Sequence, residues 1–261
     1  MFTALTIAGS DPSGGAGVQG DLKTFHAHGV YGMAAVTALT AQNTRGVSGV
    51  FDVPAPFVAR QIEAVLSDLP VGAAKTGMLS LADTIDAVAG VLRRQRVPFL
   101  VVDPVMVATS GDTLLRDDAV AVLVERLFPL ATLVTPNLPE AERLTDTKIA
   151  TPAEMRRAAT RLRERGARAV LLKGGHLPGD QVIDLLYADG AFHEFSDRRI
   201  RTEHTHGTGC ALSAAIAAQL ARGADLMEAV GRARAFVRRG LERAVVLGRG
   251  RNPINHLAAG G

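Results

Sequence analysis

Short, almost wholly apolar segments alternate with segments of helical periodicity along most of the chain. Three of these apolar segments each follow a candidate helix, at 99–102, 132–134 and 169–172. Strands without a polar face are buried on both sides, which happens when helices cover a parallel sheet from above and below. The sequence therefore predicts an α/β fold with a mostly parallel central sheet and helices on both faces.

The other periodicities and turn residues extend this framework. Further strands are predicted at 3–8, 33–40 and 72–75, and a hairpin through Asp189-Gly190 is predicted to join 183–188 to 192–195. Helices are predicted at 18–28, 57–69, 82–94, 119–127, 152–165, 210–222 and 226–243. Neither an internal repeat nor a linker-like segment is present, so we expect residues 1–261 to form a single domain.

Composition excludes several classes of protein. Apolar residues make up 47% of the chain and charged residues 21%, which is the balance of a globular protein with a sizeable core. Aromatic residues are only 4% and the arginines are scattered, so nothing indicates binding of nucleic acid. No apolar window is long enough to cross a membrane, and the first residues lack the basic region of a signal peptide. A single cysteine excludes an internal disulfide, and we expect a cytoplasmic location.

Polar residues follow several of the predicted strands. They are Asp11, Asp103, Asn137 and Lys173. Open α/β sheets bind their ligands outside the carboxyl ends of the strands. These four positions, although far apart in the sequence, are therefore predicted to meet at one cleft.

The stretch GAGVQG at 15–20 matches the glycine pattern of dinucleotide-binding proteins. That pattern also requires an acidic residue about 20 positions further on, which would bind the ribose hydroxyls. No Asp or Glu occurs between Leu22 and Phe51, so a nicotinamide cofactor is disfavoured. A Walker A sequence is absent too, so a nucleotide site in this chain must be of another type.

The stretch HTHGTGCALSAA at 204–215 contains the single cysteine and leads into an apolar helix of small residues. Glycines at 207 and 209 allow successive N–H groups to point into one concavity, and the helix behind adds its positive dipole end. This arrangement predicts an anion hole for phosphate oxygens. At a helix start the thiolate of Cys210 is favoured, so it could accept a proton from an alcohol. The alternative interpretation is that Cys210 is a small apolar filler.

Two carboxylates are candidates for binding Mg²⁺. Asp103 ends an apolar strand, and Glu140 lies just after another strand, on a short helix. Mg²⁺ commonly takes one or two carboxylates together with phosphate oxygens and water. Either residue could instead be a helix cap or a surface carboxylate. Lys173 ends a third strand, where its ammonium can meet a phosphate. The histidines at 176, 204 and 206 lack a ligand partner at a spacing typical of zinc sites.

Seven stretches together resemble the hydroxymethylpyrimidine/phosphomethylpyrimidine kinases of thiamine biosynthesis, within the ribokinase-like superfamily. They are AGSDPSGGAGVQGDLKTF, TALTAQNT, KTGML, VVDPVMVATSG, TPNLPEA, LLKGGH and THGTGCALSAA. The resemblance covers nearly the whole chain. It implies a three-layer sandwich with a central sheet of about eight strands.

The resemblance also implies an activity. ATP phosphorylates 4-amino-5-hydroxymethyl-2-methylpyrimidine, and a second transfer to the monophosphate gives the diphosphate used for thiamine phosphate. Carried over residue by residue, it places the pyrimidine against Asp21, Gln42, Met78 and Val105. It places ATP and its phosphates against Asn137, Lys173, Thr208 and the glycines Gly207 and Gly209, and Mg²⁺ near Asp103 and Glu140. Sugar kinases of the superfamily carry an aspartate base where this chain has Cys210.

The same resemblance leaves related alternatives open. A pyridoxal kinase on this fold would also phosphorylate a hydroxymethyl group on a nitrogen heterocycle. A non-catalytic pyrimidine sensor would keep the cleft without turnover. The resemblance suggests a homodimer. The C-terminal stretch GRGRNPINH is only loosely like the family's glycine-rich tail, and we assign it no substrate contact.

Overall fold

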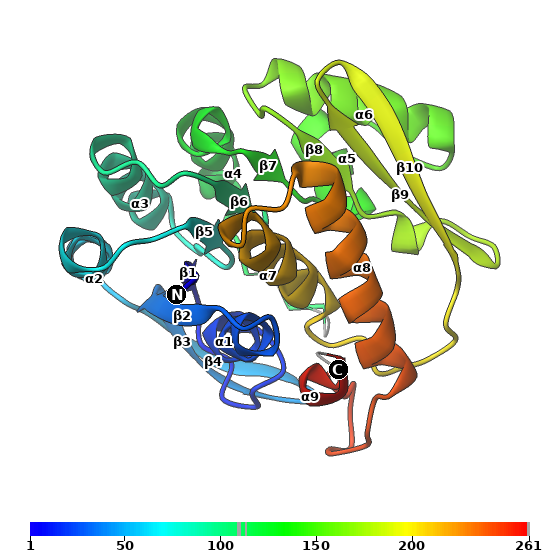
Figure 1. The fold of residues 1–261 in the computed structure, drawn as a ribbon, viewed down its shortest axis with the longest axis horizontal. Helices are drawn as coiled ribbons and strands as arrows, with labels where there is room; N and C mark the ends of the chain where they lie inside the picture. The colour runs from blue at the N-terminus through cyan, green and yellow to red at the C-terminus, as the bar shows by residue number, and fades with distance from the viewer. Residues whose placement is uncertain (109–110, 113, 260–261) are drawn as a thin grey trace.

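A central sheet of eight strands crosses the molecule in the order β10-β9-β8-β7-β6-β5-β1-β2 (Figure 1). The computed structural model describes residues 1–108, 111–112 and 114–259, so Thr109 and Ser110 of the VVDPVMVATSG stretch lie outside it. The strands of this sheet are β1 (Thr3–Ala8), β2 (Tyr31–Val36), β5 (Ala73–Thr76), β6 (Leu100–Val102), β7 (Leu133–Val134), β8 (Val170–Leu172), β9 (Gln181–Ala188) and β10 (Ala191–Arg198).

Strand pairing confirms the predicted mostly parallel sheet. The neighbours from β2 through β8 pair in parallel, and only the pairs β8–β9 and β9–β10 at one edge are antiparallel. The antiparallel edge is the hairpin that Asp189-Gly190 predicted, with both turn residues at positive φ. The parallel strands consequently end at the same edge, where the predicted polar residues follow them.

Helices cover both faces of the sheet, as predicted (Figure 1). On one face lie α1 (Gly17–Ala27), α7 (Thr208–Ala221) and α8 (Leu226–Glu242), and on the other α2 (Ala55–Asp68), α3 (Ala82–Arg94), α4 (Asp117–Arg126), α5 (Leu138–Thr145) and α6 (Pro152–Glu164). Two 3₁₀ turns, η1 (Phe128–Leu130) and η2 (Gly174–His176), and the short α9 (His256–Ala259) complete the described elements. This is the three-layer arrangement that the family resemblance implies.

The helix α7 is buried on all sides because its side chains are small. Residues 211–220 are all buried, and the helix packs against α1, α8 and the strands β1, β5 and β6. An alanine-rich sequence allows this close packing at low cost in side-chain entropy. The first turn of α7, with Cys210, is thereby fixed at the ligand-binding edge of the sheet.

One predicted strand, 33–40, is two strands in the structure. The chain leaves the central sheet after β2, and β3 (Ala38–Asn43) pairs with β4 (Gly46–Asp52) in a separate two-stranded sheet. The break is at Thr37, whose N–H donates to the carbonyl of Ala8 at 3.0 Å and whose hydroxyl donates to the carbonyl of Met78 at 2.6 Å. No glycine or proline marks this break, so the hydrophobic pattern alone reads as continuous.

Among the described residues, none of the helices combines the length and the apolar character needed to cross a membrane.

Candidate active site

A cavity of about 680 Å³ opens at the carboxyl edge of the parallel strands. All but one of the residues that the sequence assigned to a site line this cavity. They are Gln42, Met78, Asp103, Val105, Asn137, Glu140, Lys173, Gly207, Thr208, Gly209 and Cys210. They come from β3, from the loops after β5, β6 and β8, and from the N-caps and first turns of α5 and α7. The fold therefore brings these separate motifs to one place, as the positions after the strands predicted.

The glycine-rich turn before α7 forms the floor of the cavity. Gly207 is the N-cap of α7 with φ +78, and a Cβ there would lie 1.9 Å from the carbonyl oxygen of Gly15. Only glycine allows both this left-handed backbone and this close approach of two loops. The positive dipole end of α7 consequently opens onto the cavity, where it favours anions such as phosphate.

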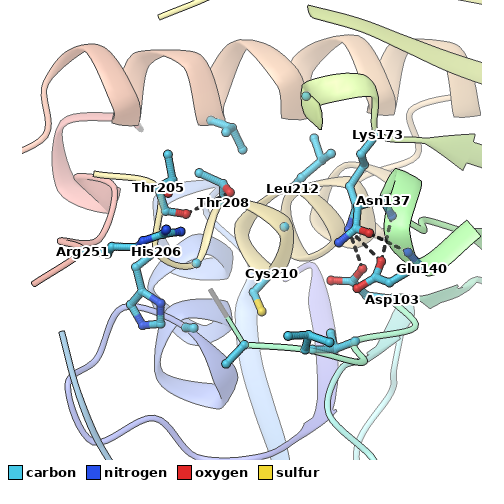
Figure 2. Close-up of a pocket in the computed structure, with 18 of the residues that line it drawn as sticks. Asp103, Asn137, Glu140, Lys173, Thr205, His206, Thr208, Cys210, Leu212 and Arg251 are labelled. Carbon is cyan, nitrogen blue, oxygen red and sulfur yellow. Dashed lines mark hydrogen bonds and ion pairs between the residues drawn. The ribbon is translucent and has the colours of Figure 1, made fainter. Parts of the chain in front are cut away.

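Cys210 lies in the first turn of α7 and faces the cavity (Figure 2). The structure does not bear out the expectation that the helix start favours the thiolate of Cys210. Burial raises the pKa of the Cys210 thiol to about 11, and the carboxylates of Asp21 and Asp103 act in the same direction. The ammonium of Lys75 and the N–H of Gly17 oppose this shift without cancelling it. The resting cysteine is therefore a thiol at neutral pH.

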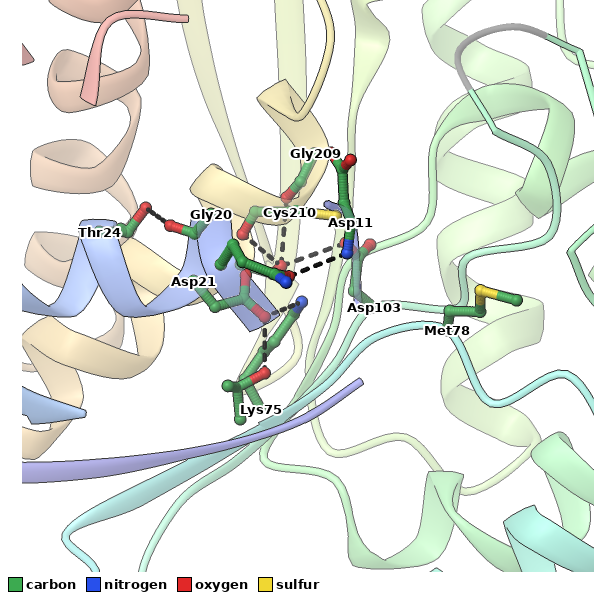
Figure 3. A network of polar contacts seen from close by, with 12 residues as sticks. Asp11, Gly20, Asp21, Thr24, Lys75, Met78, Asp103, Gly209 and Cys210 are labelled. Carbon is green, nitrogen blue, oxygen red and sulfur yellow. Dashed lines mark hydrogen bonds and ion pairs between the residues drawn. The ribbon is translucent and has the colours of Figure 1, made fainter. Parts of the chain in front are cut away.

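Asp21 is the one assigned residue that does not line the cavity, so the structure does not place it against the pyrimidine. Its carboxylate is fully buried in α1, where it accepts hydrogen bonds from Lys75 Nζ at 2.8 Å and from the hydroxyl of Thr6 at 2.6 Å. Figure 3 shows this ion pair beside Cys210. Burial disfavours a charged Lys75, but Asp21, Cys210 and Asp103 together raise the pKa of Lys75, which stays protonated.

Asp103, Glu140 and Lys173 form a charged cluster on one side of Cys210 (Figure 2). Lys173 Nζ lies 2.8 Å from Asp103 Oδ1 and 4.0 Å from Glu140 Oε2. Against the effect of burial, the two lysines Lys173 and Lys75 hold the pKa of Asp103 below its usual range. Burial and the nearby Asp103 raise the pKa of Glu140 to about 7, although Lys173 opposes the shift.

Asn137 and Glu140 also cap the helix α5. The side chain of Asn137 accepts from the N–H of Glu140 at 2.9 Å, and the N–H of Asn137 donates to Glu140 Oε2 at 2.7 Å. This reciprocal capping box satisfies two backbone donors at the helix start. The capping role that the sequence left open for Glu140 is therefore real, and it fixes the carboxylate at the cavity wall.

The pair Asp103 and Glu140 fits Mg²⁺ in the way that phosphoryl-transfer enzymes bind it. No group of three or more His, Cys, Asp or Glu side chains suited to a metal occurs among the described residues. Mg²⁺ does not need such a group when phosphate oxygens and water complete its octahedron. Both carboxylates line the cavity, and one cation, Lys173, lies within 4.0 Å of each of them.

Asp11, which the sequence predicted to lie at the cleft, lines the cavity, and so do Lys75, His206 and Arg251, among other residues. His206 Nε2 lies 2.7 Å from Asp11 Oδ2, and both side chains are buried. Asp11 also accepts from backbone N–H groups of the first loop, so this contact ties that loop to the turn before α7. Asp11 follows a strand, Lys75 lies in KTGML and His206 lies in THGTGCALSAA, so all three carried a signal, whereas no motif marked Arg251.

A cavity of this chemistry at the strand ends of a mostly parallel sheet defines a ribokinase-like small-molecule kinase, a phosphotransferase. The comparisons with known proteins agree, and they identify the family within this class. A family model described as Phosphomethylpyrimidine kinase matches residues 11–255, and the chain belongs to that family.

Relatives of known name match almost the whole chain. A hydroxymethylpyrimidine/phosphomethylpyrimidine kinase of Rhizobium meliloti is 54% identical over 258 residues, which are 97% of this chain and 96% of that protein. A thiamine biosynthesis bifunctional protein of Geobacter sulfurreducens is also 54% identical, over 98% of this chain. The chain spans only 52% of that longer protein.

Solved structures confirm the fold. A phosphomethylpyrimidine kinase from Clostridium difficile superimposes with a TM-score of 0.82 at 42% identity, over 91% of this chain and 98% of that one. Bacillus subtilis pyridoxal kinase, solved as an ADP complex, superimposes with a TM-score of 0.91 at 36% identity, over 99% and 98%.

Proposed function

We propose that the chain is an ATP-dependent kinase of hydroxymethylpyrimidine and of its monophosphate, acting in thiamine biosynthesis. The observation that supports this most strongly is the convergence of Gln42, Cys210 and Lys173 on one cavity in a chain of this family. Gln42 offers a donor and an acceptor to a pyrimidine edge, while Met78 and Val105 contribute apolar contacts. Lys173 and the turn from Gly207 to Gly209 bind phosphates, with Asn137 and Thr208 beside them on the nucleotide side.

In the first transfer, the hydroxymethyl oxygen attacks the γ-phosphorus of ATP, and the bond from this phosphorus to the bridging oxygen breaks. ADP leaves with the electron pair of that bond, and the hydroxyl proton passes to the sulfur of Cys210 in its thiolate form. The N–H groups at the start of α7 stabilise charge on the transferring phosphoryl group. Lys75, protonated and close to Cys210, favours the thiolate.

In the second transfer, a phosphate oxygen of the monophosphate attacks the γ-phosphorus, and ADP leaves in the same way. This oxygen already carries negative charge, so no proton must be removed by Cys210. Asp103 and Glu140 would hold Mg²⁺ directly or through water, and the ion would supply positive charge next to the phosphates. Lys173 binds phosphate oxygens in both transfers.

Pyridoxal kinase is the second candidate function. The high TM-score of the superposition on the Bacillus subtilis pyridoxal kinase favours it, because that protein covers the same length of chain. The sequence relatives with higher identity over the whole chain are named as pyrimidine kinases, which favours the first candidate.

We propose further that the chain forms a homodimer through the outer face of the β3–β4 hairpin. Leu39 and Phe51 pair across this hairpin and are 50% and 66% exposed. Thr40 and Gln42, which alternate with them along β3, line the cavity on the inner face. A partner subunit that covers Leu39 and Phe51 would therefore pack against β3 and stabilise the position of Gln42.

The experiment that tests the function measures ADP release from ATP and Mg²⁺ with three acceptors in parallel: hydroxymethylpyrimidine, its monophosphate and pyridoxal. We expect turnover with both pyrimidines and little turnover with pyridoxal. Turnover mainly with pyridoxal would assign the chain to vitamin B6 salvage on the same fold. Pyrimidine binding without ADP release for any acceptor would contradict a catalytic role and favour a sensor.

A further inference from the structure

The turn 204–207, directly before α7, packs closely against the first loop of the chain, 9–16. A Cβ at Gly207 would lie 1.9 Å from the carbonyl oxygen of Gly15, and a Cβ at Gly15 would lie 2.6 Å from Cδ2 of His206. The backbone of each segment therefore touches the other with no side chain between them. Because the two segments are almost 200 positions apart in the sequence, some contact must hold them together.

A buried hydrogen bond joins the two segments. His206 Nε2 lies 2.7 Å from Asp11 Oδ2, and the two side chains are only 8% and 3% exposed. Against the effect of burial, hydrogen bonds from His206 and Ser13 hold the pKa of Asp11 below its usual range. An ionised carboxylate only accepts hydrogen bonds, so Nε2 carries the hydrogen and donates it to Asp11. Hydrogen bonds to a charged acceptor are the stronger kind, so this one suits a structural link.

Asp11 is fixed within its own loop. Its Oδ1 accepts from the N–H of Ser13 at 2.9 Å and from the hydroxyl of Ser13 at 2.7 Å. Its Oδ2 accepts from the N–H groups of Gly15 at 3.2 Å and Ala16 at 2.8 Å, in addition to His206. The carboxylate therefore cannot follow a displaced ring, and the position of His206 is referred to the whole first loop.

Other hydrogen bonds of the turn run within it or to the C-terminal segment. The N–H of His206 donates to the carbonyl of Asn252 at 3.2 Å. The carbonyl of Thr205 accepts from the hydroxyl of Thr208 at 3.0 Å, and the N–H of Thr205 donates to the carbonyl of Glu203 at 3.0 Å. These contacts maintain the shape of the turn, but they do not fix it against the first loop.

The turn determines where the first N–H groups of α7 lie. Ala211 is the residue whose N–H donates to the carbonyl of the N-cap, Gly207, at 2.8 Å. The N–H groups of Gly209 and Cys210 come before this bond and so remain for a ligand at the cavity. Such donors stabilise a transferring phosphoryl group only if they are in place before charge develops on it. A displacement of about 1 Å is enough to lower a rate roughly 100-fold.

We propose that His206 is a positioning residue, which holds the N–H groups at the start of α7 in place for the transferring phosphoryl group through its hydrogen bond to Asp11. This rests on the proposed function of the chain. Nε2 of His206 already donates to Asp11, so this nitrogen is not a base for the acceptor. Both transfers use the same N–H groups, whereas Cys210 is needed in the first transfer only. The role of His206 therefore predicts a loss with both acceptors.

The test compares His206→Leu with His206→Gln. The leucine removes the donor but fills a similar space, and the glutamine keeps an N–H donor at about the position of Nε2. The matched control is His204→Leu, the same exchange in the same turn. His204 is half-buried, does not line the cavity, and its Nδ1 has no hydrogen-bond partner. For each protein, kcat and KM are measured with both pyrimidines and with ATP, well below its melting temperature.

We expect His206→Leu to lower kcat roughly 10- to 100-fold with both acceptors, because the N–H groups act on charge that develops in the transition state. The KM values for the acceptors and for ATP should change less than about threefold, since ground-state binding does not depend on this charge. His206→Gln is expected to recover most of kcat, and His204→Leu to resemble the unmodified protein. A purely structural role of His206 would lower the melting temperature and leave kcat of the folded variant unchanged.

Several results would overturn the proposal. They are an unchanged kcat in His206→Leu, a loss expressed mainly in KM, a loss confined to hydroxymethylpyrimidine, and a His206→Gln variant as impaired as His206→Leu. If His206→Leu does not fold, His206→Asn replaces it, because its shorter amide does not span the distance to Asp11. Turnover of pyridoxal alone by the unmodified protein would refute the proposed function, and kcat with pyridoxal would then decide the role of His206.

Discussion

At the scale of the residue, Cys210 combines a position suited to a base with an environment that keeps it protonated. Its raised pKa of about 11 leaves roughly one thiolate in ten thousand at pH 7. A proton acceptor that is needed only late in a dissociative transfer can still serve, because the alcohol becomes acidic as the bond to phosphorus forms. This raised pKa has a direct consequence for the pH dependence of the two transfers.

We expect kcat for hydroxymethylpyrimidine to rise as pH increases from 7 to 10, because the thiolate fraction grows about tenfold per pH unit below the pKa of Cys210. We expect kcat for the monophosphate to depend much less on pH in this range. Cys210→Ser should lower the first activity about 100-fold and largely preserve the second. For the unmodified protein and for Cys210→Ser, kcat with each acceptor is measured as ADP release over a pH series. If Cys210→Ser lost both activities equally, this division between the two transfers would be contradicted. The protonation of Cys210 is checked independently by its reaction with iodoacetamide at pH 7, which is expected to be slow because the thiol is protonated.

Residue types were easier to predict than the direction in which each side chain points. The motifs correctly brought Asp103, Asn137, Glu140 and Lys173 to one cavity, because strand ends determine where these positions lie. Asp21 was assigned to the substrate because its motif matches, but its place in α1 buries the carboxylate against Lys75. That contact joins residues 54 positions apart, and no local pattern reports it.

At the scale of the element, the start of α7 depends on a backbone that only glycine adopts without strain. Gly207→Ala would place a Cβ 1.9 Å from the carbonyl of Gly15 at a positive φ, so the turn must move away from the first loop. We expect kcat to fall about 100-fold or more, as happens when one donor of an oxyanion hole is lost.

The matched control for this substitution is Gly190→Ala in the β9–β10 turn. Gly190 has φ +80, nearly that of Gly207, but a Cβ there would meet no atom within 4 Å. Gly190→Ala should lower the free energy of unfolding by about 1–2 kcal/mol and leave kcat unchanged. The melting temperature and kcat of both variants are compared. Similar kcat values for the two variants would show that close approach at Gly207 is not needed for catalysis.

Elements with a strong hydrophobic period were predicted well from the sequence, whereas the β3–β4 hairpin was not predicted. The segments 82–94 and 3–8 have the same bounds in the structure as in the prediction. The β3–β4 hairpin was missed because β4 is exposed and contains two glycines, so it lacks the apolar alternation that marks a strand. A register shift opposite Ala41 and Gln42 leaves Ser48 as an extra residue and further breaks the alternation on β4.

At the scale of the whole molecule, the proposed homodimer predicts a solution mass of twice the 27.4 kDa chain. Phe51→Glu puts a charge in the outer face of the hairpin and should shift the protein toward the monomer. Leu257→Glu is the control, because Leu257 is 86% exposed on α9 and is not part of this hairpin. The mass of each variant is measured by light scattering after size exclusion. A monomeric unmodified protein, or a Phe51→Glu variant that stays dimeric, would contradict an interface at this face.

The contact between the turn at Gly250 and Thr44 joins positions 206 residues apart. During synthesis, the central sheet and its helices can form before the segment 248–252 has emerged from the ribosome. The wall that carries Arg251 cannot be completed until that segment has emerged. A chain cut before residue 248 would therefore keep most of its core, but its cavity would lack the wall to which Arg251 contributes.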